Sequence, residues 1–168
     1  DEGSPVALRR RALEAAVRSP EDWQSEAVKV AYSSGDPLWR LTAVFCMRFI
    51  PGFEAQILES LDSDDNELLY EAVLAAGVWC VDDAWERVTK LLNQGDDRDL
   101  LMAAIEALPQ IRPEEAELLL SPLLGHQDEE IVEAVTEVLA LCGGEDFDED
   151  ADFEDDLDDR DDKHDSPA

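Results

Sequence analysis

The sequence predicts an all-α protein built as an array of repeated helical pairs. Two observations carry this prediction: small residues recur behind acidic helix-start signals, and leucines recur with nearly the same period in the shorter segments between them. The small residues are Ala43, Ala72, Ala104 and Val135, at intervals of 29, 32 and 31 residues. A fixed period of this length is typical of arrays in which each pair buries its apolar face against its neighbours.

The first helical pair is expected at about residues 5–33. Its two helices are predicted over residues 5–18 and 20–32, because Pro20 followed by two acidic residues is a typical helix start. Tyr32 lies 29 residues before Leu61, and this spacing places the first pair in the register of the later ones.

Each later repeat is expected to begin with a helix capped by an aspartate. The four aspartates are Asp36, Asp65, Asp97 and Asp128. Their carboxylates can accept hydrogen bonds from the free amides of the first turn. Pro37 suits the first helical position, where a missing N–H costs no hydrogen bond. Apolar residues then recur at helical spacing, so we expect each helix to bury a wide face.

A shorter second helix is predicted in each of these repeats. These helices are expected over residues 53–61, 84–92 and 116–124. Leu61, Leu92 and Leu124 are 31 and 32 residues apart, so the second helices share the period of the first. The resulting hairpins span about residues 36–62, 66–93 and 98–125. A last helix is expected over residues 128–142, where the two following glycines end it.

The charge is strongly acidic, with 43 acidic and 13 basic residues and a net charge of −30. Residues 145–168 hold 14 of the acidic residues, and such a density predicts a disordered acidic tail behind a repeat domain at 5–144. Nucleic acid is excluded as a direct ligand, because its phosphates require a basic surface. A basic protein is the expected partner. Adaptation to salt, or solubility alone, stays open as an explanation of the acidity.

Cysteine usage and hydropathy favour a cytoplasmic protein without a cofactor, a metal site or a membrane partner. Cys46, Cys80 and Cys142 lie far apart, and the chain has two histidines. Cys46 takes the repeat position of a small core residue. The most apolar stretch, residues 73–81, is too short to cross a bilayer. Because the chain begins at Asp1, a processed product and an excerpt of a longer protein both stay open.

One repeat carries a recognisable signature. The segment Asp36-Pro-Leu-Trp-Arg-Leu-Thr-Ala43-Val-Phe-Cys46 resembles the D-P-x-V-R-x-x-A-A-x-A pattern of HEAT repeats, particularly the short bacterial kind also found in phycobilisome lyases. The resemblance covers residues 36–143 well and residues 5–35 loosely. It implies a right-handed α-solenoid of about four HEAT-like hairpins plus a final helix. Later repeats carry Leu69, Leu101 and Val132 where the first carries Arg40.

Stacked helical pairs leave an extended surface on the side of the second helices, and we expect a partner to bind in this groove. Two successive rungs of the groove are formed by Glu54, Trp85 and Glu117 and by Leu58, Thr89 and Ser121. A tryptophan flanked by carboxylates would anchor a basic partner. Packing of Trp85 between repeats is the alternative. Trp23, Trp39 and Trp79 are expected to pack in the core.

The tail offers a second binding element, because Phe147 and Phe153 lie between its many carboxylates. Aromatic residues within an acidic segment can anchor on a basic surface while the charge speeds the encounter. A purely solubilising tail is the alternative.

The sequence therefore predicts a non-catalytic scaffold or adaptor that binds a basic protein through the second-helix groove, the tail, or both. Enzymatic activity is not expected, because His126 is the one histidine outside the tail and no catalytic triad or metal motif accompanies it. Two alternatives stay open: a phycobilisome-lyase-like accessory protein that binds a tetrapyrrole, and an interaction module cut from a larger protein. A bound tetrapyrrole would colour the purified protein.

Overall fold

The computed structural model describes residues 5–19, 21–93 and 97–142, and this part of the chain contains helices and turns but no β-strand. The prediction of an all-α protein is therefore confirmed for the described residues. The predicted tail at 145–168, with Phe147 and Phe153, lies outside them. In chain order the elements are α1 (Val6–Ala16), α2 (Asp22–Tyr32), α3 (Pro37–Met47), α4 (Glu54–Ser60), α5 (Asn66–Val78), η1 (Asp82–Ala84), α6 (Trp85–Leu91), α7 (Arg98–Ile111), α8 (Pro113–Leu120), η2 (Ser121–Gly125) and α9 (Glu129–Cys142).

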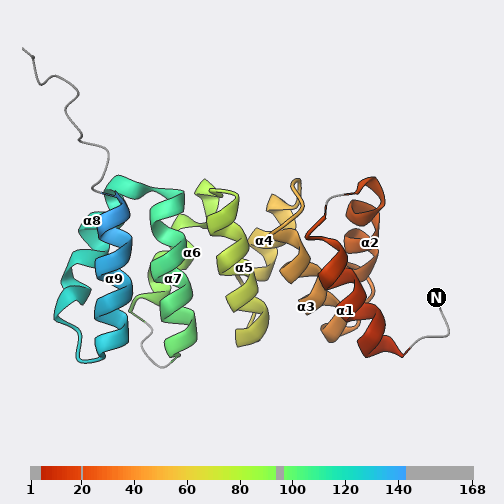
Figure 1. The fold of residues 1–168 in the computed structure, drawn as a ribbon, viewed down its shortest axis with the longest axis horizontal. Coiled ribbons are helices and arrows are strands. Elements are labelled where there is room, and N and C mark those ends of the chain that lie inside the picture. Colours follow the sequence, from red (N-terminus) through yellow and green to blue (C-terminus); the bar gives the residue numbers. More distant parts are fainter. Residues whose placement is uncertain (1–4, 20, 94–96, 143–168) are drawn as a thin grey trace, which may run out of the picture.

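The helices lie in two rows along the long axis of the molecule (Figure 1). The first-helix row consists of α1, α3, α5, α7 and α9, each of which contacts the next. The second-helix row consists of α2, α4, α6 and α8. These helices pack against the following member of the first row, since α2 contacts α3, α4 contacts α5, α6 contacts α7 and α8 contacts α9. Each second helix therefore joins its own repeat to the next one.

The four predicted aspartate caps are confirmed. Each carboxylate accepts a hydrogen bond from the backbone N–H two residues further on, at 2.8 Å for Asp36 and 3.0 Å for Asp65, Asp97 and Asp128. Pro37 occupies the first turn of α3, as expected. These caps fix where each helix of the first row begins after α1, and so they set the register of the repeats.

The predicted core positions are also confirmed. Ala43, Ala72, Ala104 and Val135 are completely buried. Cys46 is completely buried as well, as are Ala75 and Ala107 at the equivalent positions of the next two repeats. Small residues are needed here because the backbones of neighbouring first-row helices come close together.

The second helices are shorter than predicted, and the last of them changes its geometry. The α-helix α8 ends at Leu120, and the following residues form the 3₁₀ segment η2. Pro122 explains the change, because it has no N–H to donate to the carbonyl of Leu118. The prediction that Ser121 and Leu124 belong to an α-helix is therefore wrong, and Leu124 is 44% exposed.

Trp23 does not pack in the core as predicted, because its side chain is 52% exposed. The next residue, Gln24, takes the buried position instead. Its amide donates to the carbonyls of Ala16 at 2.9 Å and Ser19 at 2.8 Å, so it closes the turn between α1 and α2. Trp39 and Trp79 do pack against the core, and the Trp79 indole donates to the carbonyl of Met47 at 2.7 Å.

None of the helices within the described ranges is both long enough and apolar enough to cross a bilayer.

Candidate functional site

Trp85 on the second-helix row lies between two surface clefts. One cleft, of about 470 Å³, is lined by Trp85 together with Leu58 and a group of charged residues. The other, of about 500 Å³, is lined by Trp85 and Thr89 together with apolar residues of α8 and η2. Trp85 therefore shares one of these clefts with the predicted partner-binding residue Leu58 and the other with Thr89. Glu54, Glu117 and Ser121 are exposed but line neither of these clefts.

The face of the Trp85 ring is already in contact with a cation from the same chain. The Arg112 guanidinium lies 5.3 Å from the ring centroid. It donates to both carboxylate oxygens of Asp82, at 2.7 and 2.8 Å, and these hydrogen bonds raise the pKa of Arg112. Sequence reasoning missed this contact. The one signal for it is that Asp82 and Arg112 are 30 residues apart, close to one repeat period.

A larger cleft lies on the first-helix row and was not predicted. We call it the acidic cleft. It has a volume of about 550 Å³ and is formed by residues of α1, α3, α5 and α7 together with the cap of α7. Its lining residues are Arg10, Glu14, Leu41, Thr42, Phe45, Asn66, Glu67, Tyr70, Glu71, Asp97, Asp99 and Leu100. Five of these are carboxylates and one is a cation, so the cleft is strongly negative.

The repeat itself builds one wall of the acidic cleft. Glu67 and Asp99 stand two residues after the caps Asp65 and Asp97, so they occupy the same position in successive repeats. The Asn66 amide donates to the Asp97 carboxylate at 2.6 Å and joins the starts of α5 and α7. The equivalent residue of α9, Glu130, is neutralised by Arg98, which also binds Asp128. In the sequence, the signal for this wall was a carboxylate two positions after the capping aspartates of α5 and α7.

The opposite wall holds a chain of hydrogen bonds between α1 and α3. The buried hydroxyl of Thr42 accepts from Arg10 Nε at 2.8 Å and donates to Glu14 Oε1 at 2.8 Å. Arg10, the cation of the lining, is therefore fixed against this wall. The neutral hydroxyl of Thr42 lies between Arg10 and Glu14 and connects these two side chains through its hydrogen bonds.

Glu71 is a half-buried carboxylate of the cleft, and its pKa is raised. Burial is the largest cause, and the nearby Glu14 raises the pKa further. Arg48, whose Nη1 lies 3.4 Å from a Glu71 oxygen, lowers the pKa but does not outweigh the burial. A carboxylate in this state is stabilised by an additional positive charge, which the cleft leaves room for.

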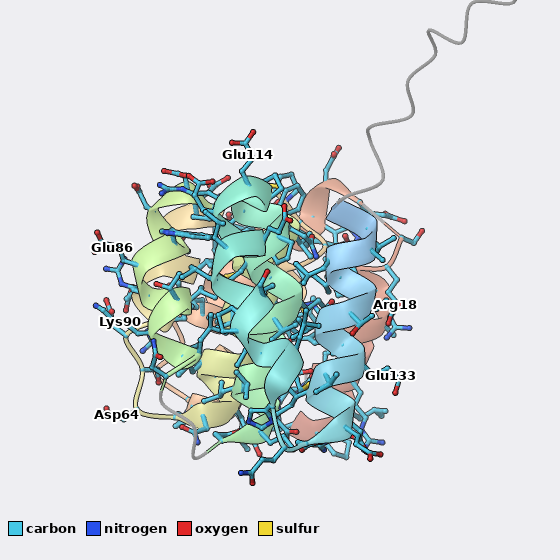
Figure 2. All side chains as sticks on the ribbon, turned by 90° about the vertical axis from the view of Figure 1, so that its left-hand side faces the viewer. Arg18, Asp64, Glu86, Lys90, Glu114 and Glu133 are labelled. Atoms are coloured by element: carbon cyan, nitrogen blue, oxygen red, sulfur yellow. The ribbon has the colours of Figure 1, made fainter. Side chains whose placement is uncertain are left out.

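Most of the arginines outside α1 already have acidic partners in the chain. Ion pairs join Arg40 to Glu59, Arg48 to Glu71, Arg87 to Asp62, Arg98 to Asp128 and Arg112 to Asp82. Exposed carboxylates such as Asp64, Glu86 and Glu114 lie around the molecule when it is seen down its long axis (Figure 2). The folded part therefore presents a largely acidic surface, and five of its carboxylates line the acidic cleft.

The arrangement in the acidic cleft suits recognition of cations. Its carboxylates can accept hydrogen bonds from ammonium or guanidinium groups, and Phe45 and Tyr70 provide an apolar surface for their alkyl stems. Comparison with protein-family models finds no match to this chain. A comparison with curated proteins also finds none. The resemblance to HEAT repeats therefore depends on the repeat residues themselves.

Proposed function

We propose that this chain is a right-handed solenoid of about four HEAT-like hairpins that acts as a non-catalytic scaffold or adaptor and binds a basic protein. The observation that carries the proposal is the acidic cleft, where five carboxylates surround a cavity of about 550 Å³. Complementary charge of this kind speeds association and selects for cationic partners, while it repels nucleic acid.

The first-helix row supports the proposal better than the predicted groove around Trp85. The clefts beside Trp85 contain the cations Arg87, Lys90 and Arg112 as well as the carboxylates Asp82, Asp83 and Glu86, so their charges offset each other, whereas the acidic cleft holds five carboxylates and one cation. Arg112 also covers one face of the Trp85 ring that an incoming cation would need. Two other surfaces compete with the acidic cleft. One is the predicted groove, formed by Glu54, Leu58, Trp85, Thr89, Glu117 and Ser121. The other is the tail, with Phe147 and Phe153.

A capture experiment separates these three surfaces. The full chain is immobilised, exposed to native lysate at low and physiological salt, and the retained proteins are identified by mass spectrometry. The cleft variant is Glu67→Lys/Asp99→Lys. Its matched control is Glu86→Lys/Glu114→Lys, which makes the same charge change in the first turns of α6 and α8, on the second-helix side. A Trp85→Ala variant and a chain without residues 145–168 complete the set.

The proposal predicts that a specific basic protein is retained by wild type, by the control and by the tail-deleted chain, but lost from the cleft variant. Loss from Trp85→Ala with retention by the cleft variant would instead assign the predicted second-helix groove. Retention that vanishes with the tail, is unselective and falls away at modest salt would contradict a specific partner altogether.

A further inference from the structure

The two ends of the molecule differ in charge. Helices α1 and α2, over residues 6–32, contain five Lys or Arg and four Asp or Glu. The segment from α8 to α9, over residues 113–142, contains eight Asp or Glu and no Lys or Arg. Arg11 and Arg18 on the first end are exposed, as is Glu133 on the second. The molecule is therefore polarised along its long axis.

Exposed apolar side chains gather at the same two ends. Eight of the ten large exposed hydrophobic residues of the described chain belong to these ends, so the repeats between them are better covered. At the first end they are Val6, Leu8, Trp23 and Val30. At the second end they are Leu118, Leu119, Leu124 and Leu141, of which Leu118 is 78% and Leu141 75% exposed.

Helix α9 is covered on one side only within the described chain. Val138 occupies the repeat position of Ala75 and Ala107, which are completely buried between neighbouring helices, yet Val138 is only half-buried. At the other end, an apolar cavity of about 400 Å³ opens among α1, α2 and α3, with Leu13, Val30 and Trp39 in its lining. Each end thus resembles a repeat that lacks one neighbour.

We propose that the α8–α9 end of one molecule binds the α1–α2 end of a second copy, so that the helical rows continue from copy to copy. Helices α1 and α2 carry a net charge of +1 and the α8–α9 segment one of −8, so the exposed Arg11 and Arg18 of one end can face carboxylates of the other, and each end supplies apolar surface. Seen down the long axis, Arg18 and Glu133 lie on the same flank of the molecule (Figure 2). A shift along this axis therefore brings Arg18 of one copy toward Glu133 of the next.

Such a contact uses different surfaces on the two copies, so it repeats in an open series unless a rotation closes it into a ring. The net charge of −30 opposes association at low salt. At physiological ionic strength the Debye length is about 8 Å, so repulsion between distant charges is screened while contacts at the ends persist. Association should therefore be measured at physiological salt.

The test is sedimentation velocity of the full chain over a wide range of concentrations, with a reducing agent present. Leu118→Glu/Leu141→Glu places two carboxylates in the apolar contact, and Val78→Glu makes the same kind of change on α5, away from the ends. Arg18→Glu and Glu133→Arg each remove the charge complementarity. Their matched controls are Lys90→Glu and Glu86→Arg, both exposed residues of α6.

We expect the wild-type mass to rise with concentration beyond that of a dimer. Leu118→Glu/Leu141→Glu should weaken association by about tenfold or more, because carboxylates in an apolar contact are costly to desolvate. Arg18→Glu or Glu133→Arg alone should weaken it by about threefold, as expected for exposed ion pairs. The two charge changes combined in one chain should restore association, and this rescue cannot arise from misfolding.

A monomer at every concentration would overturn the proposal. So would a closed dimer that is lost in Leu118→Glu/Leu141→Glu but unaffected by Arg18→Glu, because the two acidic ends would then face each other. Either result would leave the binding of a basic partner in the acidic cleft untouched, since Glu67, Glu71 and Asp99 of that cleft belong to α5 and α7, away from both ends.

Discussion

A Cβ atom placed on Gly77 would lie 2.9 Å from the Cα of Ala107 and 3.0 Å from its Cβ. Helices α5 and α7 thus approach each other at a point where only a glycine fits. Because the neighbouring atom is backbone, the contact cannot be relieved by turning a side chain. This crossing fixes the distance between two repeats whose first turns carry Glu67 and Asp99 of the acidic cleft.

Gly77→Ala should therefore destabilise the protein although alanine favours helix formation. The gain in helix propensity is about 1 kcal/mol, whereas overpacking of a close contact costs about 1–3 kcal/mol. Urea unfolding measures the difference. Val78→Ala, at an exposed position of the same helix, serves as the control and should change stability little. A Gly77→Ala variant as stable as wild type would show that α5 and α7 are not closely packed.

Cys80 should be replaceable by glycine with a gain in stability. It has a φ of 48°, in the left-handed region, where it ends α5 while Val81 N–H donates to the carbonyl of Ala76 at 2.9 Å. A side chain in this conformation costs about 1 kcal/mol that glycine avoids. Thermal unfolding should rank Cys80→Gly above wild type. Cys80→Ala, which keeps the Cβ, should show no such gain, and equal stability of the two variants would refute the explanation.

Cys46 and Cys80 should differ sharply in reactivity. Burial raises the pKa of Cys46 to about 12, and Glu14 and Glu71 add to the effect. At a pH near 8 the Cys46 thiol therefore stays protonated, and its side chain is completely buried. Cys80 is exposed. Iodoacetamide followed by peptide mapping should label Cys80 in the native protein and Cys46 only after unfolding. Early labelling of Cys46 would place it outside the core.

Glu71→Gln should make the protein more stable at neutral pH. Because burial raises the pKa of Glu71 in the folded state, the folded protein favours the protonated form. This contribution is fully present below the unfolded pKa and is lost as the pH rises through the folded pKa. The advantage of Glu71→Gln over wild type should therefore shrink as the pH falls toward the ordinary range of a glutamate.

Urea unfolding of both proteins at a series of pH values checks this dependence. Asp82 and Asp128 have lowered pKa values, because Arg112 and Arg98 bind them, and their contributions have the opposite sign. They are present in both proteins, so they cancel in the difference. A Glu71→Gln variant that is less stable at neutral pH would mean that the ion pair with Arg48 outweighs the burial of the carboxylate.

The sequence predicted those features that depend on local chemistry. An aspartate cap acts within one turn of its own helix. A small residue is required wherever the backbones of two neighbouring helices come close together. Both features therefore recur in the sequence as regular patterns. The errors came from competition between neighbours. Gln24 takes the buried position beside Trp23, and Pro122 converts the end of α8 to a 3₁₀ segment that contains Ser121 and Leu124.

The acidic cleft could not be derived in the same way, because it belongs to several helices at once. Glu14, Glu71 and Asp99 come from α1, α5 and α7, and only the packing of the first-helix row brings them to one cavity. The repeat period did contain a partial signal, since Glu67 and Asp99 follow their caps by the same two residues. The contact of Arg112 with Trp85 could not be predicted from the sequence either. Trp85 begins α6 and Arg112 directly precedes α8, and only the fold brings the two side chains together.

The most direct test of the central claim is the affinity of the captured basic protein for the full chain, measured by isothermal titration calorimetry at physiological salt. Binding at the acidic cleft predicts that Glu67→Lys/Asp99→Lys raises the Kd by about tenfold or more, as expected when charge pairs in an interface become repulsive. The control Glu86→Lys/Glu114→Lys should stay within about twofold of wild type, as exposed charges outside a contact contribute little. Unchanged affinity in the cleft variant, with a loss in the control, would contradict the account.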